Sequence, residues 1–351
     1  MKRLSIPKRR KPYLKAWWWT LFWTVLLVLF LALVVLRFFF VEGRSMRETL
    51  LPGDFVFIDK LGYGARLPQH PVGIPYSDRF YLSSVELPYI RLPGFTGIQR
   101  MDVLAFDSPM GPAARSKTVR RTLMKRCVGL PGDTLAIRGG KVFVNGKQLE
   151  RPPQVVTHYH MKAISKNTAE RVFKEYGIRR HIRLSNRGDH VVPLTEGEAR
   201  KLRRDTAVRF VKHWEGEASS QSGFFPRDPE FSWGPGKIGP LWIPDQGSSI
   251  ALDTSNLPLY ERIIEVYEGH ELSVQEDGTI RIDGKERTRY TFSKDYFYVL
   301  GDSRPYSKDS RVWGFLPEDH VIGRAIFVLF SYDMREGGGG FRWDRTFQAI
   351  P

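Results

Sequence analysis

Three short stretches of this 351-residue chain hold residues that together could supply a nucleophile, a base and charged supporting groups: a serine, a lysine, and a cluster of acids and arginines. The serine is Ser45, in RSMRETLLPGD, between a glycine-containing turn and a strand-like segment. Because a free hydroxyl is almost fully protonated at neutral pH, Ser45 can act as a nucleophile only with a base beside it. Most serines near a glycine simply cap or turn the chain, and position alone leaves that alternative open.

The base that the sequence favours is Lys125. It lies in the apolar, strand-like run LMKRCVGL, where alternation can turn one side chain inward. An ammonium that loses its water is driven toward the neutral form, and neutral lysine can accept a serine proton. A surface lysine with a buried stem is the alternative. The histidines offer no obvious partner: His158 and His160 fall in an expected insertion, and His320 follows an expected helix start.

The third stretch is GDSRPYSKDSRVWGFLP, residues 301–317. It follows an apolar strand-like run, residues 296–300, and is dense in glycine, aspartate, serine and arginine. By its composition alone it also fits a loop pinned by Asp–Arg pairs and Asx-type hydrogen bonds.

A membrane anchor is expected ahead of these stretches. Residues 16–36 form 21 uncharged residues, AWWWTLFWTVLLVLFLALVVL, enough for a helix to cross a hydrocarbon core of about 30 Å. Residues 17–19 fit an aromatic belt at one interface, and residues 37–40 fit the other. Seven basic residues and no acid in residues 1–15 predict a cytoplasmic N-terminus. A cleaved secretory signal would need a shorter apolar core and a small-residue cleavage site.

Charge and cysteine content narrow the function further. The formal charge is +16, of which residues 1–15 carry +7. The remainder is spread over a long polar region, which favours attraction to lipid headgroups over nucleic-acid binding, and no nucleic-acid motif is present. Cys127 is the only cysteine, so an internal disulfide is excluded and a thiolate zinc site is disfavoured. We expect neither a metal nor a cofactor.

The remaining pattern predicts a mainly β fold. Residues 54–59 and 102–106 read as strands, and Asn145-Gly146 and Asp283-Gly284 are signals of two-residue hairpin turns. Many short strands with glycine turns favour an antiparallel β-rich domain. Residues 62–100 form either a loop resting on the bilayer or a packed loop.

Helices are expected in an insertion. One begins at residues 167–170 and stops at Gly177, and a capping box at residues 195–198 leads into a helix over residues 199–215. Four glycines at 337–340 predict a flexible linker. The predicted divisions are a cytoplasmic tail (1–15), an anchor (16–40), a catalytic β core (41–150 and 290–333), an insertion with accessory β and helical parts (151–289) and a flexible tail (334–351).

Taken in order, the three stretches resemble type I signal peptidases, bacterial membrane-bound serine proteases that remove signal peptides. RSMRETLLPGD is similar to the family's Ser-Met-x-Pro-Thr-Leu box with its Gly-Asp strand entry, and MKRCVGLPGD to its Lys-Arg-x-x-Gly-x-Pro-Gly-Asp box. GDSRPYSKDSRVWG resembles the Gly-Asp-Asn-Arg-x-x-Ser-x-Asp-Ser-Arg-x-Trp-Gly box, and VIGRA at 321–325 continues as the family does. The resemblance covers residues 41–60, 100–150 and 290–333.

The resemblance implies a role for each matching residue. Ser45 falls on the nucleophile, whose backbone N–H belongs to the oxyanion hole, and Lys125 falls on the general base. Ser307 falls on a serine that helps orient the lysine. The supporting charged residues are Asp302, Asp309 and Arg311.

The chain departs from the family pattern beside these residues. Glu48 replaces a proline, and Ser303, Pro305 and Tyr306 replace residues that are usually Asn, Asp and Asn. Gly43 stands where some members carry a serine that donates to the oxyanion.

Substrate class follows from the same resemblance. Signal peptides carry small residues at the first and third positions before the cut. We expect the substrate to bind extended, as an added strand. The residues expected to line its shallow apolar pockets, or else simply to pack in the core, are Phe39, Val41, Met46, Leu50, Leu123 and Met124. The expected partners are exported preproteins and the phospholipid bilayer, with the translocation machinery as a further one. The expected location is the inner or plasma membrane, crossed once, with the catalytic domain outside.

Three other functions compete with this one. A self-cleaving Ser/Lys protease of the repressor type requires a DNA-binding domain, where this chain has an apolar run. An inactive membrane-anchored β domain that binds exported proteins or lipid is a rival of another class. A penicillin-binding enzyme is disfavoured, because its Ser-x-x-Lys spacing would require lysine where Glu48 stands.

Overall fold

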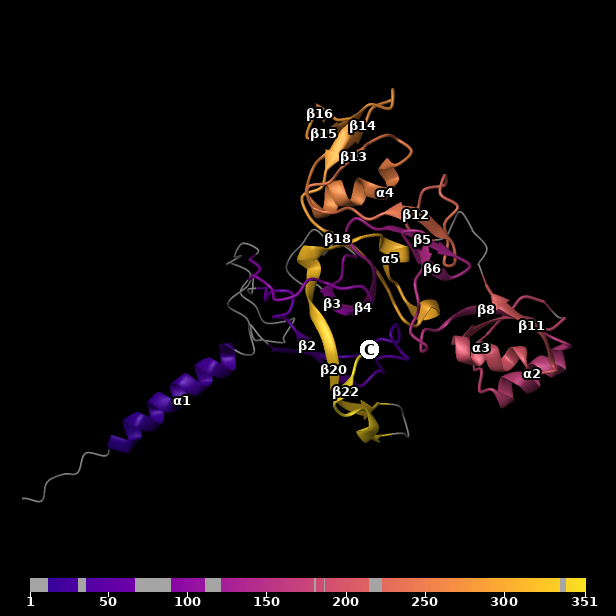
Figure 1. The fold of residues 1–351 in the computed structure, drawn as a ribbon, viewed down its shortest axis with the longest axis horizontal. Coiled ribbons are helices and arrows are strands. Elements are labelled where there is room, and N and C mark those ends of the chain that lie inside the picture. The colour runs from indigo at the N-terminus through magenta and orange to yellow at the C-terminus, as the bar shows by residue number, and fades with distance from the viewer. Residues whose placement is uncertain are drawn as a thin grey trace, which may run out of the picture.

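The computed structural model describes residues 12–30, 36–66, 90–110, 121–179, 181–185, 187–214, 223–334 and 339–351. Figure 1 shows a central sheet with a second group of strands above it and a lobe to its right, and helix α1 (Pro12–Phe30) extends away from them. Over these described ranges, no helix combines the length and hydropathy of a membrane span. Residues 1–11 of the predicted basic tail and residues 31–35 of the predicted anchor lie outside the described residues.

The central sheet has nine strands, and every pairing within it is antiparallel. Its order is β1-β2-β20-β3-β4-β18-β19, with β21 and β22 also paired to β20. The bounds are β1 (Leu36–Phe40), β2 (Asp54–Asp59), β3 (Val103–Asp107), β4 (Thr122–Gly129), β18 (Tyr296–Leu300), β19 (Leu316–Pro317), β20 (Val321–Asp333), β21 (Gly340–Phe341) and β22 (Gln348–Ala349). The mainly antiparallel β prediction is confirmed. The predicted anchor extends too far, because its residues 36–40 form strand β1.

A second group of strands covers β4 and β18 from above in Figure 1. It contains the sheet β12-β5-β6-β7, the pair β13-β17 and the sheet β14-β15-β16. Their bounds are β5 (Thr134–Arg138), β6 (Lys141–Val144), β7 (Lys147–Gln148), β12 (Ile238–Trp242), β13 (Ser249–Ala251), β14 (Leu272–Val274), β15 (Ile280–Ile282), β16 (Lys285–Glu286) and β17 (Arg289–Thr291). Helix α4 (Leu257–Arg262) and π-helix η3 (Ile263–Tyr267) pack on them. Both predicted hairpin turns are confirmed, because Asn145 and Asp283 take positive φ values of 52° and 51° before their glycines.

The insertion is a separate lobe with its own core, to the right in Figure 1. Its sheet has the order β11-β8-β10-β9. The bounds are β8 (Thr157–Ala163), α2 (Lys166–Glu175), β9 (Ile182–Arg183), β10 (Asp189–Leu194), α3 (Glu196–Arg203) and β11 (Val208–His213). The lobe contains fewer residues than the predicted insertion (151–289), because β12, which lies within that range, pairs with β5 of the catalytic part.

The two predicted helices of the insertion exist, with different ends. Helix α2 begins after an N-cap at Ser165, and α3 begins with the predicted capping box between Thr195 and Glu198. The extension of the second helix to residue 215 is wrong. It ends at Arg203, because Val208–His213 pairs with β8 as strand β11 and buries Val208 and Val211 in the lobe's core.

The prediction of a flexible tail is wrong for residues 339–351. Strands β21 and β22 pair with β20, and Ile350 packs on the core beneath Ser45. Arg345 forms a 2.6 Å ion pair with the fully buried Asp54. Residues 335–338, which include two of the four glycines, lie outside the described residues. The remaining short helices are η4 (Arg304–Tyr306), α5 (Ser310–Trp313), η5 (Glu318–His320) and η6 (Trp343–Arg345).

Candidate active site

Ser45 lies in the tight loop that joins β1 to β2. The loop is closed at its base, where Val41 and Asp54 share a backbone hydrogen bond of 2.9 Å, and Gly53 N–H donates to Val41. Inside it, the N–H groups of Thr49 and Leu50 both donate to Met46 O. Met46 and Leu50 point into the core, so the loop turns on buried apolar side chains and leaves Ser45 partly exposed. We call residues 42–50 the serine loop.

Lys125 reaches Ser45 from β4. Its Nζ donates to Ser45 Oγ at 2.7 Å, although Lys125 and Ser45 are 80 positions apart in the sequence. The same Nζ also donates to Met124 O at 2.9 Å. Of the two alternatives that the sequence leaves open, the structure has the inward one, because Lys125 is only 3% exposed. Burial lowers the pKa of Lys125 to about 8, with a smaller opposing effect from Asp309. A lysine with this pKa is partly neutral near pH 8, and a neutral amine at this distance can take the hydroxyl proton.

Asp302 ties the serine loop to the neighbouring strands. Residue Arg126 of β4 pairs with Leu300 of β18, and this register brings Arg126 to Asp302, which follows the end of β18. The two form a buried ion pair at 2.7 Å. Thr49 Oγ1 donates to the same carboxylate at 2.5 Å. The pair therefore braces the loop that carries the serine.

Asp309 and Arg311 form a second buried ion pair, at 2.8 Å. Asp309 also caps α5 and accepts from Gly301 N–H at 3.0 Å. Burial alone would raise the pKa of Asp309, but Arg311 holds it below its ordinary value. Arg311 Nη2 donates to Arg304 O at 2.8 Å. The predicted bracing pair is thus formed, and it shapes the loop beside Lys125.

Ser307 approaches the site across Gly301. A Cβ added to Gly301 would lie 2.2 Å from Ser307 Oγ and 2.6 Å from Ser45 O, so glycine alone fits between them. Ser307 Oγ is buried and has no hydrogen-bond partner in the described part of the chain. Its predicted role in orienting the lysine stays a prediction.

The backbone N–H of Ser45, which is the predicted oxyanion donor, has no hydrogen-bond acceptor in the described part of the chain. Ser45 O accepts from Ser303 N–H at 2.9 Å, which fixes the serine's backbone. Within the described ranges, Ser45 N–H donates to no other residue. In those same ranges no group of three or more His, Cys, Asp and Glu side chains could hold a metal ion.

A cavity of about 520 Å³ opens at the dyad. Ser45 and Lys125 line it together with residues of β1 and β4. The six apolar residues expected at a substrate pocket all line it as well: Phe39, Val41, Met46, Leu50, Leu123 and Met124. Val41, Met46, Leu50 and Met124 are also buried in the core, and the role of these residues in binding substrate stays a prediction.

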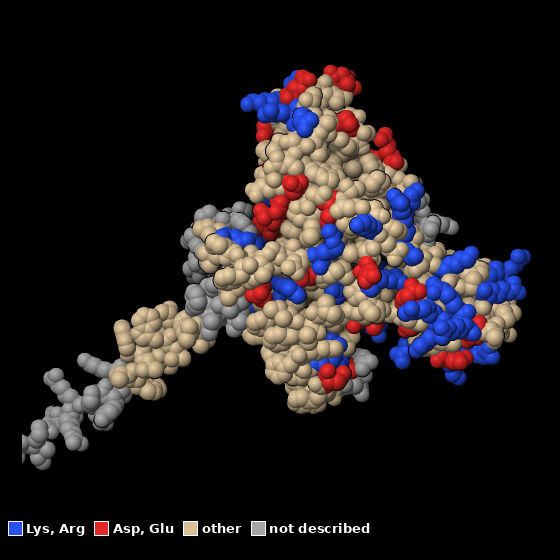
Figure 2. Space-filling view, viewed as in Figure 1, with Lys and Arg blue, Asp and Glu red and all other residues tan. Residues whose placement is uncertain are grey.

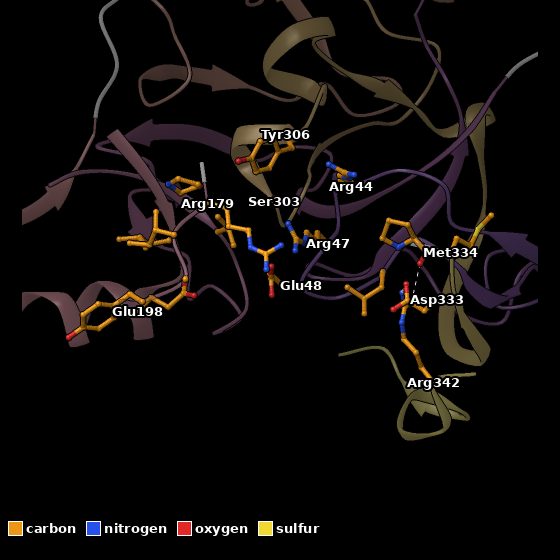
Figure 3. Close-up of a pocket in the computed structure, with 18 of the residues that line it drawn as sticks. Arg44, Arg47, Glu48, Arg179, Glu198, Ser303, Tyr306, Asp333, Met334 and Arg342 are labelled. Carbon is orange, nitrogen blue, oxygen red and sulfur yellow. Dashed lines mark hydrogen bonds and ion pairs between the residues drawn. The ribbon is translucent and has the colours of Figure 1, made fainter. Parts of the chain in front are cut away.

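A larger cavity, about 860 Å³, lies on the other side of the serine loop and was not expected from the sequence. Figure 3 shows Arg47 and Glu48 of the loop facing Arg179 and Glu198 of the insertion across it. Burial raises the pKa of Glu48; Arg47 lowers it and Glu198 raises it further. Three departures from the family pattern, Glu48, Ser303 and Tyr306, line this cavity and are the sequence signals of this surface.

The family model described as signal peptidase, peptidase S26, matches residues 14–198 and 249–330. The chain belongs to this family. The matched ranges include Ser45, Lys125 and the block from Asp302 to Arg311, whereas residues 199–248 lie outside them.

Relatives within the signal peptidase family align along most of the chain. Signal peptidase I of Buchnera aphidicola subsp. Baizongia pistaciae (strain Bp) is 24% identical over 92% of this chain and 80% of its own length. Signal peptidase I of Helicobacter pylori (strain ATCC 700392 / 26695) is 22% identical over 93% of this chain and 90% of its own length. A crystal structure of a signal peptidase I from Enterococcus faecalis V583 aligns with 65% of this chain, over 97% of its own residues. The sequence identity is 15% and the TM-score is 0.24. The family model and the two relatives named above identify the chain as a peptidase of this family.

Proposed function

We propose that this peptidase removes N-terminal signal peptides from exported preproteins by a Ser45/Lys125 dyad. The observation that carries the proposal is the 2.7 Å contact between Lys125 Nζ and Ser45 Oγ, at the edge of an apolar cavity. The membership in the signal peptidase family supports the substrate class.

The proposed reaction has two halves. Neutral Lys125 takes the proton of Ser45 as the hydroxyl oxygen attacks the scissile carbonyl, and the N–H of Ser45 stabilises the oxyanion. The intermediate collapses, Lys125 gives its proton to the leaving amine, and the mature protein departs. The signal peptide remains as an ester on Ser45. Lys125 then removes a proton from water, and the attack of this water releases the signal peptide and restores Ser45.

Specificity for small residues at the first and third positions before the cut is assigned to the cavity at the dyad. An extended segment against the edge of β1 would turn alternate side chains toward it. Because apolar side chains such as Phe39, Leu123 and Met124 already fill its walls, bulky substrate side chains would collide with them.

Residues 16–36 are proposed as a single membrane anchor, with the catalytic domain outside the inner or plasma membrane. The described side chains of α1 from residue 16 to residue 28 are all exposed, including Trp17, Trp18 and Trp19 at 59–64%. An uncharged helix with apolar side chains all round fits a lipid environment. Ile90, Leu92 and Phe95 are exposed too, which favours contact of this loop with the bilayer. Contact with the translocation machinery is a further proposal.

Cleavage of a signal-peptide precursor by the purified full chain tests the dyad. Ser45→Ala and Lys125→Ala should each lower kcat/KM at least ~1,000-fold, since each removes a group used in the chemical step. Ser273→Ala and Lys147→Ala, at exposed positions, are the matched controls and should keep full activity. Circular dichroism verifies that all four variants fold. Retained cleavage by Ser45→Ala would exclude this mechanism, and cuts within the chain itself would favour the self-cleaving alternative.

A further inference from the structure

A third cavity, about 520 Å³, lies between the catalytic part and the insertion. Its walls come from β4, β6, the segment 148–157, α3 and β11. It shares no lining residue with the cavity at Ser45 or with the larger cavity across the serine loop. It is therefore a site of its own, and nothing in the proposed peptidase reaction uses it.

Its lining is strongly basic. Two carboxylates, Glu150 and Glu196, face six cationic side chains: Arg126, Lys141, Arg151, Arg200, Arg203 and Arg304. Glu196 is already engaged by Arg151 at 2.5 Å and Arg203 at 2.9 Å, and Arg126 is held by Asp302. The other three cations, Lys141, Arg200 and Arg304, form no ion pair with a described residue. We call this space the basic cavity.

Two buried nitrogen atoms at its wall lack partners. Arg304 Nε and His213 Nδ1 are inaccessible to solvent and make no hydrogen bond within the described residues. Burial, and then Arg311, lower the pKa of Arg304 to about 10. Burial, and then Arg151, lower the pKa of His213 to about 4. Positive charge is thus concentrated here without enough negative charge to balance it.

The insertion adds a long-range field of the same sign. Residues 151–214 contain 15 lysines and arginines against 6 aspartates and glutamates. In Figure 2 the blue side chains gather on the lobe that contains α2 and α3, beside the cavity. A cleft under such a field raises the local concentration of anions.

The position of the basic cavity favours a soluble ligand. Its elements β6, β8 and α3 lie on the opposite side of the central sheet from α1 in Figure 1. A guanidinium with no partner suits the oxygen atoms of a phosphate group, which it can contact through two parallel hydrogen bonds. We propose that the basic cavity binds a soluble phosphate-bearing anion through Arg304, with Arg200 and Lys141.

Calorimetric titration of the purified full chain tests this, with inorganic phosphate and pyrophosphate as probes at constant ionic strength. Both should bind, whereas matched chloride should not. Arg304→Gln and Arg200→Gln should each weaken binding at least about fivefold, because each removes a charge-assisted contact. Arg200 is exposed and has no described partner, so its variant keeps the test valid even if Arg304→Gln fails to fold.

Arg209→Gln is the matched control, because Arg209 is exposed on the same lobe but does not line the cavity. It should bind both probes like the wild type. If Arg209→Gln and Arg200→Gln lose equal affinity for the two probes, the anions respond to the overall positive charge of the lobe, and the proposed binding site is wrong. Absence of phosphate and pyrophosphate binding, with binding only to vesicles that contain phosphatidylglycerol, would overturn the proposal of a soluble ligand.

Discussion

At pH 7 an ordinary lysine is neutral in fewer than about one molecule in a thousand, whereas a pKa near 8 leaves roughly a tenth neutral. Burial accounts for this change at Lys125, since β4 carries it inward and its ammonium loses water. The same residue on the surface would be a poor base. The chemistry proposed for the dyad therefore depends on where one side chain lies.

This pKa predicts how cleavage depends on pH. Only the neutral form of Lys125 accepts a proton, so kcat/KM should rise about tenfold per pH unit below pH 8 and level off above it. Cleavage rates of a precursor measured between pH 6 and pH 10 give this profile. A rate that stays constant from pH 6 to pH 9 would contradict a lysine base with the pKa of about 8.

Gly43 offers a second prediction at this scale. It lines the cavity at the dyad, a Cβ there would meet nothing within 4 Å, and its φ is not positive. Gly43→Ser should therefore fit without strain and add a donor toward the oxyanion, raising kcat about tenfold. Gly43→Ala supplies the Cβ without the hydroxyl and is the control. If the two variants cleave at the same rate, the serine hydroxyl gives no such help.

At the scale of elements, the site depends on three parts of one sheet: the end of edge strand β1 and the neighbouring strands β4 and β18. The serine loop follows β1, Lys125 lies on β4, and the block from Gly301 follows β18, the neighbour of β4. The backbone contact from Ser303 to Ser45 joins the first and third of these. Their spacing is set by how closely the backbones approach at Gly301.

Gly301→Ala tests this spacing. The new Cβ would collide with Ser45 O and Ser307 Oγ, and the serine loop would have to move. We expect a fall in kcat of about 100-fold or more, since displacements of about 1 Å at a reacting group cost that much. Gly97→Ala, where a Cβ meets nothing, should be neutral in the same assay. Near-normal kcat in Gly301→Ala would show that the loop tolerates the shift.

At the scale of the whole molecule, the last described residues hold the site from behind. Arg345 contacts both Asp54 and Thr49 O, at the two ends of the turn after Ser45. Pro351 O accepts from Arg126, at 2.6 Å, next to Lys125. The tail thus connects the serine loop with β4.

Arg345→Gln should lower the free energy of unfolding by about 3 kcal/mol, because it leaves the buried Asp54 carboxylate with less compensation. Denaturant unfolding of the full chain measures the change. Arg287→Gln, at an exposed position, is the control and should stay within about 0.5 kcal/mol of the wild type. A change in Arg345→Gln no larger than the control's would mean that the tail adds little.

Features that depend on a few adjacent residues were predictable from the sequence. Strand β2 has the predicted bounds, the turns at Asn145-Gly146 and Asp283-Gly284 are hairpin turns, and the capping box at residues 195–198 starts α3. In each case the local backbone preference and a neighbouring side chain decide the conformation. The motifs single out Ser45 and Lys125, whereas alternation leaves a surface position open for Lys125, and the structure shows that this side chain is buried.

Features that depend on partners far along the chain needed the tertiary structure. Residues 208–213 become a strand because β8 offers them a pairing edge, which overrides the helical pattern. Residues 339–351 hold their place because Asp54, which lies 291 positions from Arg345, is buried and needs a cation. The two further cavities arise only where the insertion meets the catalytic part. A local pattern reports the propensity of a segment, but the free energy of burial and charge pairing is set by whichever residues the fold brings beside it.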